Sequence, residues 1–543
     1  MPKLSADSAD QQRAIDLYAA GDRPGAGRIA REILRRNPTH AGAAWLLGAL
    51  ALDEGRTEEA MLFFQHAAAR EPDDARFHNG LGEAYRALGR WPDAIACFEA
   101  AVRIDPSLAA AHHALGLTRL ETGETAQAIE DFGQAVSLRS DHARSHLNLG
   151  RAWQLHGDLP AAIRCYQEAI RLDPNYAIAH NNLGAALQVE GRSQEAAVHL
   201  RRALALKPDY PEAHYNLGNA LQGLYEPSAA WESYREALRL RPGYVNAQYQ
   251  LGLVLEQLGR REEAVQVYEQ LLAQNPGHAE GWQRLGVMHM LRRMWDQARA
   301  AFERQAACSP AKEKLSADLA YVRQMLCDWS TLAADSEQLW TQAAARIAAG
   351  QTAGIPPFFS IVLSWPADRQ LAVARAEAQS LTARHEKLRD ELQIRHQPRA
   401  AGDRLRIGYL SGDFYDHAVS HLAQGLFGLH DRRQFEIFTY SYGPDDASSY
   451  RRRIQADSEH FVDAASLTVK DLAQRIAADG ISILVDMMGY SGHSRLEVMS
   501  LRPAPIQASW LSYPGSTGAE FIDYLVGDRI VTAPERAADF SEK

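Results

Sequence analysis

The sequence predicts an all-α superhelix of stacked helix pairs, followed by an α/β lobe built on a parallel sheet. Two observations support this prediction. A 34-residue pattern recurs through roughly the first 310 residues and then stops. From residue 404 onward, apolar segments of strand length alternate with amphipathic helical ones. With 543 residues the chain is long enough for several hydrophobic cores, so both regions can fold.

Composition excludes several classes of protein. The chain is 46% hydrophobic and 23% charged, which is typical of globular proteins. Its net charge of −10 shows no basic excess, so nucleic acid is not an expected partner. No apolar run is long enough for a membrane span, and the first residues, MPKLSADSADQQ, lack the apolar core of a secretory signal. Four cysteines are too few for a disulfide framework and predict a reducing, cytoplasmic location.

Small and bulky residues recur together within the 34-residue period. The set is Gly48, Ala60 and Phe64 in the first full repeat and Gly286, Ala298 and Phe302 in the last. The small residues let two helices approach closely, and the bulky side chain fills the space between them. A proline closes every repeat except the one that ends at Ser140, because proline cannot continue a helix.

This period and these residue types are those of the tetratricopeptide repeat. We predict a degenerate capping repeat at 1–40 and eight full repeats at 41–312. A helical linker at 313–402 and an α/β lobe at 403–543 follow. The expected product of the repeats is a right-handed superhelix with a long concave groove.

One histidine position recurs with the repeat. It is occupied by His78, His112, His146, His180 and His214. Equivalent side chains of stacked helices stand about 8–10 Å apart, whereas nitrogen ligands lie about 2 Å from a metal ion. We therefore predict packing residues where consecutive repeats meet, and no metal site.

An asparagine position recurs at Asn148, Asn182 and Asn216. An amide offers donors and an acceptor, so a row of amides can hold the backbone of an extended peptide whatever its side chains. The competing interpretation is surface polarity or hydrogen bonding within a repeat. We favour acceptor-peptide binding by these three residues.

The second half changes to mixed structure. Two amphipathic runs, 320–332 and 369–392, predict helices on either side of a break at 350–357. The strands expected after residue 403 are 404–410, 435–442, 481–487, 506–513 and 521–528, and the helices are 421–430, 448–458 and 469–480. This alternation predicts a parallel sheet with helices on both faces.

Ligands of such sheets bind at the carboxyl ends of the strands, which directs attention to loops 411–421, 489–495 and 514–520. The first loop holds Asp413, His417 and His421, the second holds His493, and the third holds Ser516 and Thr517. An imidazole in the first loop can act as a general base or contact a diphosphate, and the competing interpretation is a surface or capping role. The sequence contains neither a Walker A motif nor a G-x-G-x-x-G motif.

Several segments of this half are characteristic of one family. They include LCDWSTL (326–332), RLRIGYLSGDFYDHAVSH (404–421) and LRPAPIQASWLSYPGSTGA (501–519). In these segments and in the repeats, the chain resembles the protein O-linked N-acetylglucosamine transferases, in their bacterial type. The resemblance implies a tetratricopeptide superhelix joined to a GT-B glycosyltransferase. Residues 403–543 then correspond to its Rossmann-like N-terminal lobe.

The resemblance implies an inverting transfer of N-acetylglucosamine from UDP-GlcNAc to Ser or Thr of proteins held in the repeat groove. It implies no metal and no other cofactor. Asp413 and His417 match the family's catalytic Asp and His, whose exact role as base or donor-phosphate contact stays open. The residues expected beside the donor are Ala418, Val419, Tyr490, Pro514, Gly515, Ser516 and Thr517.

The chain also departs from the animal members of this family. Ala418-Val419 replaces a Pro-Thr pair after the histidine, and Phe358 stands near the place of a second active-site histidine. Bacterial-like members share such changes, which favours a bacterial origin. The resemblance further implies that the 543 residues stop before the nucleotide-binding C-terminal lobe, so we expect this chain alone to be inactive.

Two other functions remain open at this point. Relatives of the same architecture transfer fucose from GDP-fucose, and the chain can instead be a non-catalytic tetratricopeptide scaffold. A homodimer is compatible with the repeats, but the sequence does not locate its interface.

Overall fold

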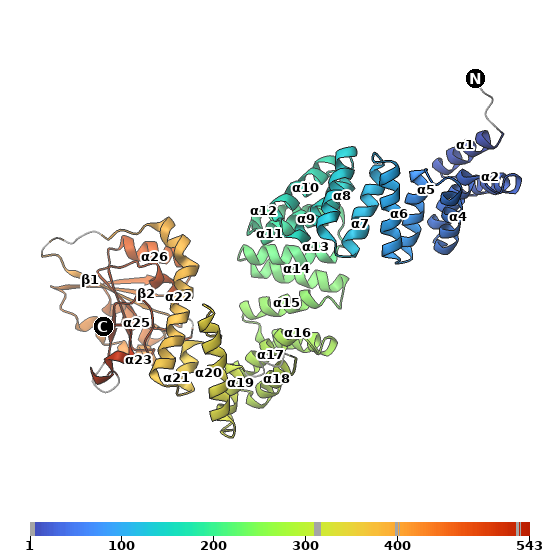
Figure 1. Cartoon of the computed structure of the whole chain (residues 1–543). Coiled ribbons are helices and arrows are strands. Elements are labelled where there is room, and N and C mark those ends of the chain that lie inside the picture. The colour runs from blue at the N-terminus through green and yellow to red at the C-terminus, as the bar shows by residue number, and fades with distance from the viewer. Residues whose placement is uncertain are drawn as a thin grey trace. The chain divides into compact units, whose positions relative to one another are not determined.

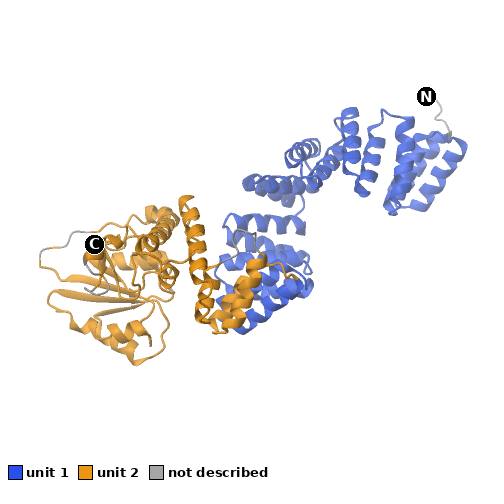
Figure 2. Cartoon of the chain, turned by 60° about the horizontal axis from the view of Figure 1, so that its bottom comes forward, with its two compact units in different colours: residues 1–274 blue, residues 275–543 orange. Residues whose placement is uncertain are grey.

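The computed structural model describes residues 6–308, 316–396, 400, 402–492, 494–527, 532 and 534–543. The chain forms two compact units, residues 1–274 and 275–543 (Figure 2). His493 and the last residues of the expected eighth repeat, 309–312, lie outside the described residues.

The first unit is a succession of helix pairs (Figure 1). The pairs are α1 (Ala6–Ala19) with α2 (Arg23–Arg36), α3 (Ala41–Asp53) with α4 (Thr57–Arg70), α5 (Ala75–Ala87) with α6 (Trp91–Ile104), α7 (Ala109–Glu121) with α8 (Thr125–Leu138), α9 (Ala143–His156) with α10 (Leu159–Leu172), α11 (Ala177–Val189) with α12 (Ser193–Leu206), α13 (Pro211–Gly223) with α14 (Pro227–Leu240), and α15 (Val245–Gln257) with α16 (Arg261–Gln274). Each 34-residue period of this unit therefore holds one pair, as predicted, and the degenerate first repeat has the same fold.

The repeat glycine permits close approach of the two helices in a pair. A Cβ atom added at Gly82 would lie 2.6 Å from the ring of Phe98, and one at Gly252 would lie 2.4 Å from the ring of Tyr268. Where the bulky residue is Leu200, the distance from the Cβ of Gly184 is also only 2.5 Å. Any side chain at this position would push the helices apart.

The recurring histidines bind the turns between repeats. In each, Nε2 donates to the carbonyl six residues earlier: His78 to Pro72 (2.8 Å), His112 to Pro106 (3.1 Å), His146 to Ser140 (3.0 Å), His180 to Pro174 (3.2 Å) and His214 to Pro208 (3.0 Å). In the next repeat Gln248 reaches Pro242 in the same way, at 3.5 Å. The prediction that these histidines are structural is confirmed.

The second unit begins with helices. They are α17 (Ala279–Leu291), α18 (Trp295–Cys308), α19 (Ala317–Met325), α20 (Leu332–Ala348), α21 (Pro357–Val362) and α22 (Ala367–Leu392). Phe302 of the eighth repeat shares a core with Val322 and Leu339 of the following helices and with Trp365, which lies between α21 and α22. The prediction of a continuous helix over 320–332 is wrong, since α19 ends at Met325 and Cys327 takes a left-handed φ of 56°.

A parallel sheet forms the rest of this unit, as predicted, but it has six strands where the sequence indicated five (Figure 1). Its strands are β1 (Leu405–Ser411), β2 (Phe435–Ser441), β3 (His460–Asp463), β4 (Ile483–Asp486), β5 (Ile506–Trp510) and β6 (Tyr524–Val526), in the order β3-β2-β1-β4-β5-β6. The other elements are α23 (Ala418–Ala423), α24 (Leu426–Leu429), α25 (Ser449–Asp457), α26 (Val469–Ala478), α27 (Leu496–Ser500) and the 3₁₀ helix η1 (Pro534–Asp539).

Helices cover both faces of this sheet. Leu410 and Leu484 point into a core shared with α22, α26 and α27, whereas Tyr409 and Val485 point into a core shared with α23, α24 and α25. The single helix expected at 421–430 is instead two short helices, because Gly425 weakens a helix interior. Strand β3 and helix α27 were not anticipated, since segments of four and five residues carry little periodic signal.

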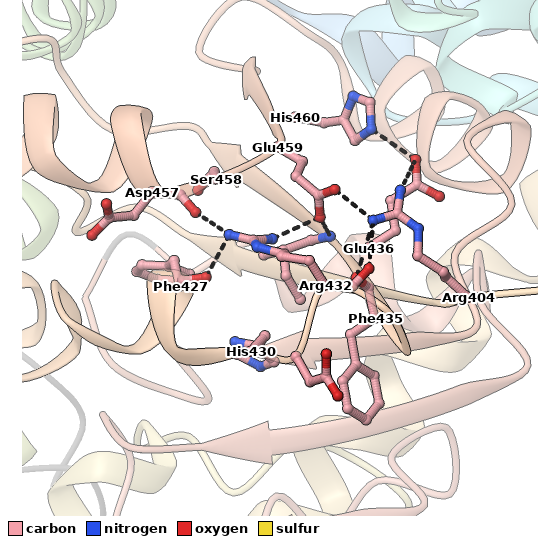
Figure 3. Close-up of polar contacts among 12 residues, drawn as sticks. Arg404, Phe427, His430, Arg432, Phe435, Glu436, Asp457, Ser458, Glu459 and His460 are labelled. Atoms are coloured by element: carbon pink, nitrogen blue, oxygen red, sulfur yellow. Dashed lines mark hydrogen bonds and ion pairs between the residues drawn. The ribbon is translucent and has the colours of Figure 1, made fainter.

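A network of ion pairs and hydrogen bonds lies at the amino edge of the sheet (Figure 3). The carboxylate of Glu459 accepts hydrogen bonds from Arg404 at 2.6 Å, from Arg432 at 2.7 Å and from the Ile437 N–H at 3.0 Å. Partial burial alone would raise the pKa of Glu459, but these hydrogen bonds outweigh it and lower the pKa. The network lies at the edge opposite the carboxyl ends of the strands, where it ties together the starts of β1, β2 and β3.

Candidate active site

The loops singled out from the sequence begin side by side. In the sheet, Leu410 of β1 lies opposite Asp486 of β4, and Asp486 lies opposite Ser509 of β5. The loops that follow these three strands therefore leave the same edge together. This edge is where parallel α/β sheets bind ligands.

The structure brings Asp413 and His417 together. Nδ1 of His417 lies 3.3 Å from Oδ2 of Asp413. The turn is fixed at both ends, because the Asp413 N–H donates to Oγ of Ser411 at 3.0 Å and Oγ of Ser420 donates to the Asp413 carbonyl at 2.6 Å. Asp413 is buried, whereas 39% of the His417 side chain is exposed, so the imidazole can reach a substrate.

The two contacts of His417 Nδ1 call for opposite positions of the ring proton. Its Nδ1 lies 3.3 Å from the Val419 N–H and 3.3 Å from Asp413, and one nitrogen cannot both accept from an amide and donate to a carboxylate. With the proton on Nδ1, the ring donates to Asp413 and Nε2 keeps a lone pair. That tautomer is the one a general base needs.

His421 does not join this pair. Its Nε2 lies 2.7 Å from Oδ1 of Asp416, and its ring stacks on Tyr450 at a centroid distance of 4.0 Å. The two histidines of this loop therefore have separate carboxylate partners.

Ala418 and Val419, expected beside the donor, differ in exposure. Ala418 is exposed at the start of α23, whereas the Val419 side chain is buried against Phe414 and Phe427. The Val419 side chain is thus part of the core, and only its backbone lies at the loop surface.

In the loop after β5, Pro514 is exposed and the next three residues are buried. Oγ of Ser516 donates to Glu542 at 2.6 Å, the Thr517 N–H donates to Glu542 at 2.6 Å, and the Thr517 hydroxyl contacts the same carboxylate. Glu542 thus accepts the hydrogen bonds that Ser516 and Thr517 were expected to donate to a ligand. No spacing in the sequence linked it to a loop 25 residues earlier.

Tyr490 joins the loops after β4 and β5. Its hydroxyl donates to the Thr517 carbonyl at 2.9 Å and to the Ala374 carbonyl at 3.2 Å, and its ring packs edge-on to Tyr513 at 5.4 Å. Gly515 is packed against the same Tyr513 ring, which a Cβ added there would meet at 3.3 Å. Tyr490 and the 514–517 loop are therefore neighbours, and their expected place beside the donor stays a prediction.

Asp486 is a second carboxyl at this edge that the sequence did not single out. It is fully buried and accepts the Gly489 N–H at 2.7 Å and the Met488 N–H at 3.3 Å. Burial raises the pKa of Asp486 to about 7, because the two N–H groups only partly replace water.

Asp486→Asn gives a pH-dependent gain in stability. A carboxyl whose pKa is raised by folding stabilises the native state below its unfolded pKa and loses that effect as the pH rises through about 7. We expect the free energy of unfolding of Asp486→Asn relative to wild type to grow by roughly 2–4 kcal/mol between about pH 4 and pH 8, measured by urea denaturation. Asp431→Asn is the control: hydrogen bonds from Arg433 and Gln434 lower the pKa of Asp431 to about 2, so its effect on stability changes only below about pH 4 and stays flat over the measured range. If the free energy of unfolding of Asp486→Asn relative to wild type did not change with pH, the raised pKa of Asp486 would be contradicted.

The asparagines of the repeats make contacts between and within repeats. Nδ2 of Asn148 lies 3.4 Å from Nε2 of His113, Nδ2 of Asn216 donates to Oδ1 of Asn181 at 2.9 Å, and Nδ2 of Asn181 donates to Oδ1 of Asn182 at 3.1 Å. Asn148 is buried, whereas Asn182 and Asn216 are half-buried. The contact of Asn148 joins two consecutive repeats, which neither interpretation anticipated, while Asn182 and Asn216 keep part of their surface exposed.

Among the described residues, no group of three or more His, Cys, Asp or Glu side chains is arranged to hold a metal ion. None of the helices in this part of the chain is long and apolar enough to cross a membrane.

The fold and site define a class of protein: a tetratricopeptide-repeat chain with a Rossmann-like lobe whose carboxyl edge carries a His–Asp pair. Residues 326–543 match the family described as Glycosyl transferase family 41. Tetratricopeptide repeat families match 17–79, 82–123, 109–142, 155–189, 190–224 and 245–288.

Named relatives agree with this assignment. The chain is 36% identical over 226 residues to the UDP-N-acetylglucosamine–peptide N-acetylglucosaminyltransferase of Caenorhabditis elegans, covering 40% of this chain and 20% of that protein. It is 44% identical over 140 residues to the "Probable UDP-N-acetylglucosamine–peptide N-acetylglucosaminyltransferase SEC" of Arabidopsis thaliana, covering 26% and 14%. A solved mutant of the Thermobaculum terrenum O-GlcNAc transferase matches 74% of this chain and 56% of its own, with 23% identity and a TM-score of 0.28.

Residues 326–543 thus form a Glycosyl transferase family 41 domain, and in its matched segments the chain is similar to these N-acetylglucosaminyltransferases. Its matched segments span a fifth or less of the length of the two curated relatives.

Proposed function

We propose that the protein transfers N-acetylglucosamine from UDP-GlcNAc to Ser or Thr hydroxyls of other proteins. The observation that supports this best is the Asp413–His417 pair, at 3.3 Å, at the ligand-binding edge of a family 41 lobe. The names of the two curated relatives support the sugar and the peptide acceptor.

In this reaction the acceptor hydroxyl oxygen attacks the anomeric carbon while the bond from that carbon to the diphosphate oxygen breaks. The hydroxyl proton passes to Nε2 of His417, UDP leaves, and the anomeric centre is inverted. Asp413 holds the ring with its proton on Nδ1 and stabilises the imidazolium that forms. The alternative role for His417 is a contact with the donor diphosphate.

The sugar is tested by offering both donors to the full-length protein. We expect UDP-GlcNAc to add one N-acetylhexosamine to acceptor proteins, detected by intact-protein mass spectrometry. Addition of a deoxyhexose from GDP-fucose would favour the fucosyltransferase alternative. Turnover of neither donor would favour the scaffold.

Residues 1–543 by themselves are proposed not to transfer sugar. Their described residues hold one parallel sheet, whereas GT-B enzymes bind the nucleotide mainly on a second lobe. Purified 1–543 is mixed with donor and acceptor, and UDP release is followed. Release at the rate of the full-length protein would overturn this proposal.

The acceptor is proposed to lie along the first helices of the repeats, where Asn182 and Asn216 present half-buried amides. Replacing both by alanine removes two hydrogen-bonding groups, so we expect acceptor-peptide affinity to fall about 3- to 30-fold. Fluorescence anisotropy with a labelled acceptor peptide measures this. Asn175→Ala, in an exposed turn, is the control and leaves affinity unchanged. Equal peptide affinity of the wild type, the double variant and Asn175→Ala would mean that Asn182 and Asn216 are purely structural.

A cytoplasmic location and a homodimer complete the proposal. All four cysteines are free, and burial raises the pKa of the Cys97 and Cys165 thiols to about 11, so neither is suited to exchange reactions. Cell fractionation tests the location, and light scattering of the purified full-length protein tests the dimer.

A further inference from the structure

The loop after β2 packs tightly against the loop that carries Asp413 and His417. A Cβ atom added at Gly443 would lie 1.8 Å from the Gly412 carbonyl oxygen, so only glycine fits there. Three residues further on, the exposed Asp446 accepts the Asp416 N–H at 2.7 Å and the Ser448 N–H at 3.0 Å. The first loop is thus held from one side by its neighbour.

Arg451 is the buried centre of this contact. It lies in α25, only 1% of its side chain is exposed, and its guanidinium lies over the Phe461 ring at 5.1 Å. Its Nη1 donates to the Phe414 carbonyl at 3.2 Å and to Oγ of Ser441 at 2.7 Å.

The same guanidinium binds two carboxylates. Its Nη2 donates to Asp463 at 3.1 Å, and its Nε lies 3.2 Å from Asp445. One planar cation therefore joins the ends of β1, β2 and β3. A lysine, with a single point charge, cannot serve these four groups at once.

We propose that Arg451 is a positioning residue, which holds Phe414 and thereby fixes Asp413 and His417 in the geometry that transfer requires. The inference rests on the proposed function. Phe414 directly follows Asp413, so releasing its carbonyl frees the turn that sets the 3.3 Å contact between Asp413 and His417. Small displacements of a catalytic group lower the rate of the chemical step more than they weaken substrate binding.

The test compares Arg451→Lys with Arg453→Lys in the full-length protein. Arg453 lies in the same helix but is exposed and pairs with Asp457. We expect Arg451→Lys to lower kcat about 10- to 100-fold and to change KM for donor and acceptor less than about threefold. Hydrogen exchange followed by mass spectrometry is expected to show faster exchange in residues 411–421, with β1 and β4 unchanged. The control variant alters neither measurement.

Asp446→Ala keeps the proposal testable if Arg451→Lys does not fold. Asp446 is exposed, so its loss leaves the core intact while freeing the Asp416 N–H. We expect faster exchange in 411–421 and a smaller fall in kcat.

The exchange measurement does not depend on transferase activity. If the wild type transfers no sugar but the variants still show faster exchange in 411–421, the positioning of the loop is kept and the proposed function is rejected. An active wild type whose Arg451→Lys or Asp446→Ala variant keeps both its kcat and its exchange rate would overturn the proposal. A fall in kcat with unchanged exchange in 411–421 would also overturn it.

Discussion

His417→Ala lowers kcat for sugar transfer by about 10²- to 10⁴-fold in the full-length protein. In the described part of the carboxyl-edge loops, His417 is the only histidine whose ring faces Asp413. When its Nδ1 donates to Asp413, its Nε2 is free to take the proton of the acceptor hydroxyl. Steady-state rates of UDP release, with saturating donor and acceptor, measure the loss. Asp413→Asn is expected to lower kcat as well, because the amide no longer favours the proton on Nδ1.

His421→Ala is the matched control for this result. His421 lies in the same loop but pairs with Asp416 and stacks on Tyr450, so we expect its kcat to stay within about threefold of wild type. A near-normal kcat for His417→Ala would remove His417 from the site.

The pH dependence of kcat/KM separates the two roles left open for His417. If it is the base, the acid limb of the wild-type profile disappears in His417→Ala. If it contacts the donor diphosphate, the limb stays and KM for UDP-GlcNAc rises.

The repeats and the parallel sheet were predictable because their signals are periodic. Gly82 and Phe98 stand in register with seven other such pairs, and the strands β1 and β2 are long apolar runs. The position of Asp413 and His417 followed from the same pattern, since a loop after a parallel strand must lie at the ligand-binding edge.

The partners of the site residues were not predictable, because they come from distant parts of the chain. Glu542 reaches Ser516 and Thr517 across 25 residues or more, and Arg451 reaches Phe414 across 37. A buried arginine in the segment SSYRRRIQADS looks like its exposed neighbours in sequence, and only packing distinguishes it. The same holds for Asn148, whose neighbour His113 lies one repeat away.

In the repeat region, Gly82→Ala is expected to lower stability when Phe98 is present and to raise it when Phe98 is replaced by alanine. Alone, Gly82→Ala places a methyl group 2.6 Å from the Phe98 ring, so overpacking of about 1–3 kcal/mol outweighs the gain of about 1 kcal/mol in helix propensity. Phe98→Ala alone leaves a cavity at a fully buried position and costs about 3–5 kcal/mol. In the Phe98→Ala background the methyl group enters that cavity, and Gly82→Ala becomes stabilising by about 1 kcal/mol.

The reversal is measured as the opening free energy of amides in α5 and α6 by native-state hydrogen exchange, since a repeat array need not unfold in one step. Gly133→Ala is the control: it lies in α8, and an added Cβ meets nothing within 4 Å. It is expected to stabilise α8 by about 1 kcal/mol with or without Phe98. If Gly82→Ala were as stabilising as Gly133→Ala in the presence of Phe98, the helices would have room to separate. Close approach would then not explain why glycine recurs at this position in the eight full repeats.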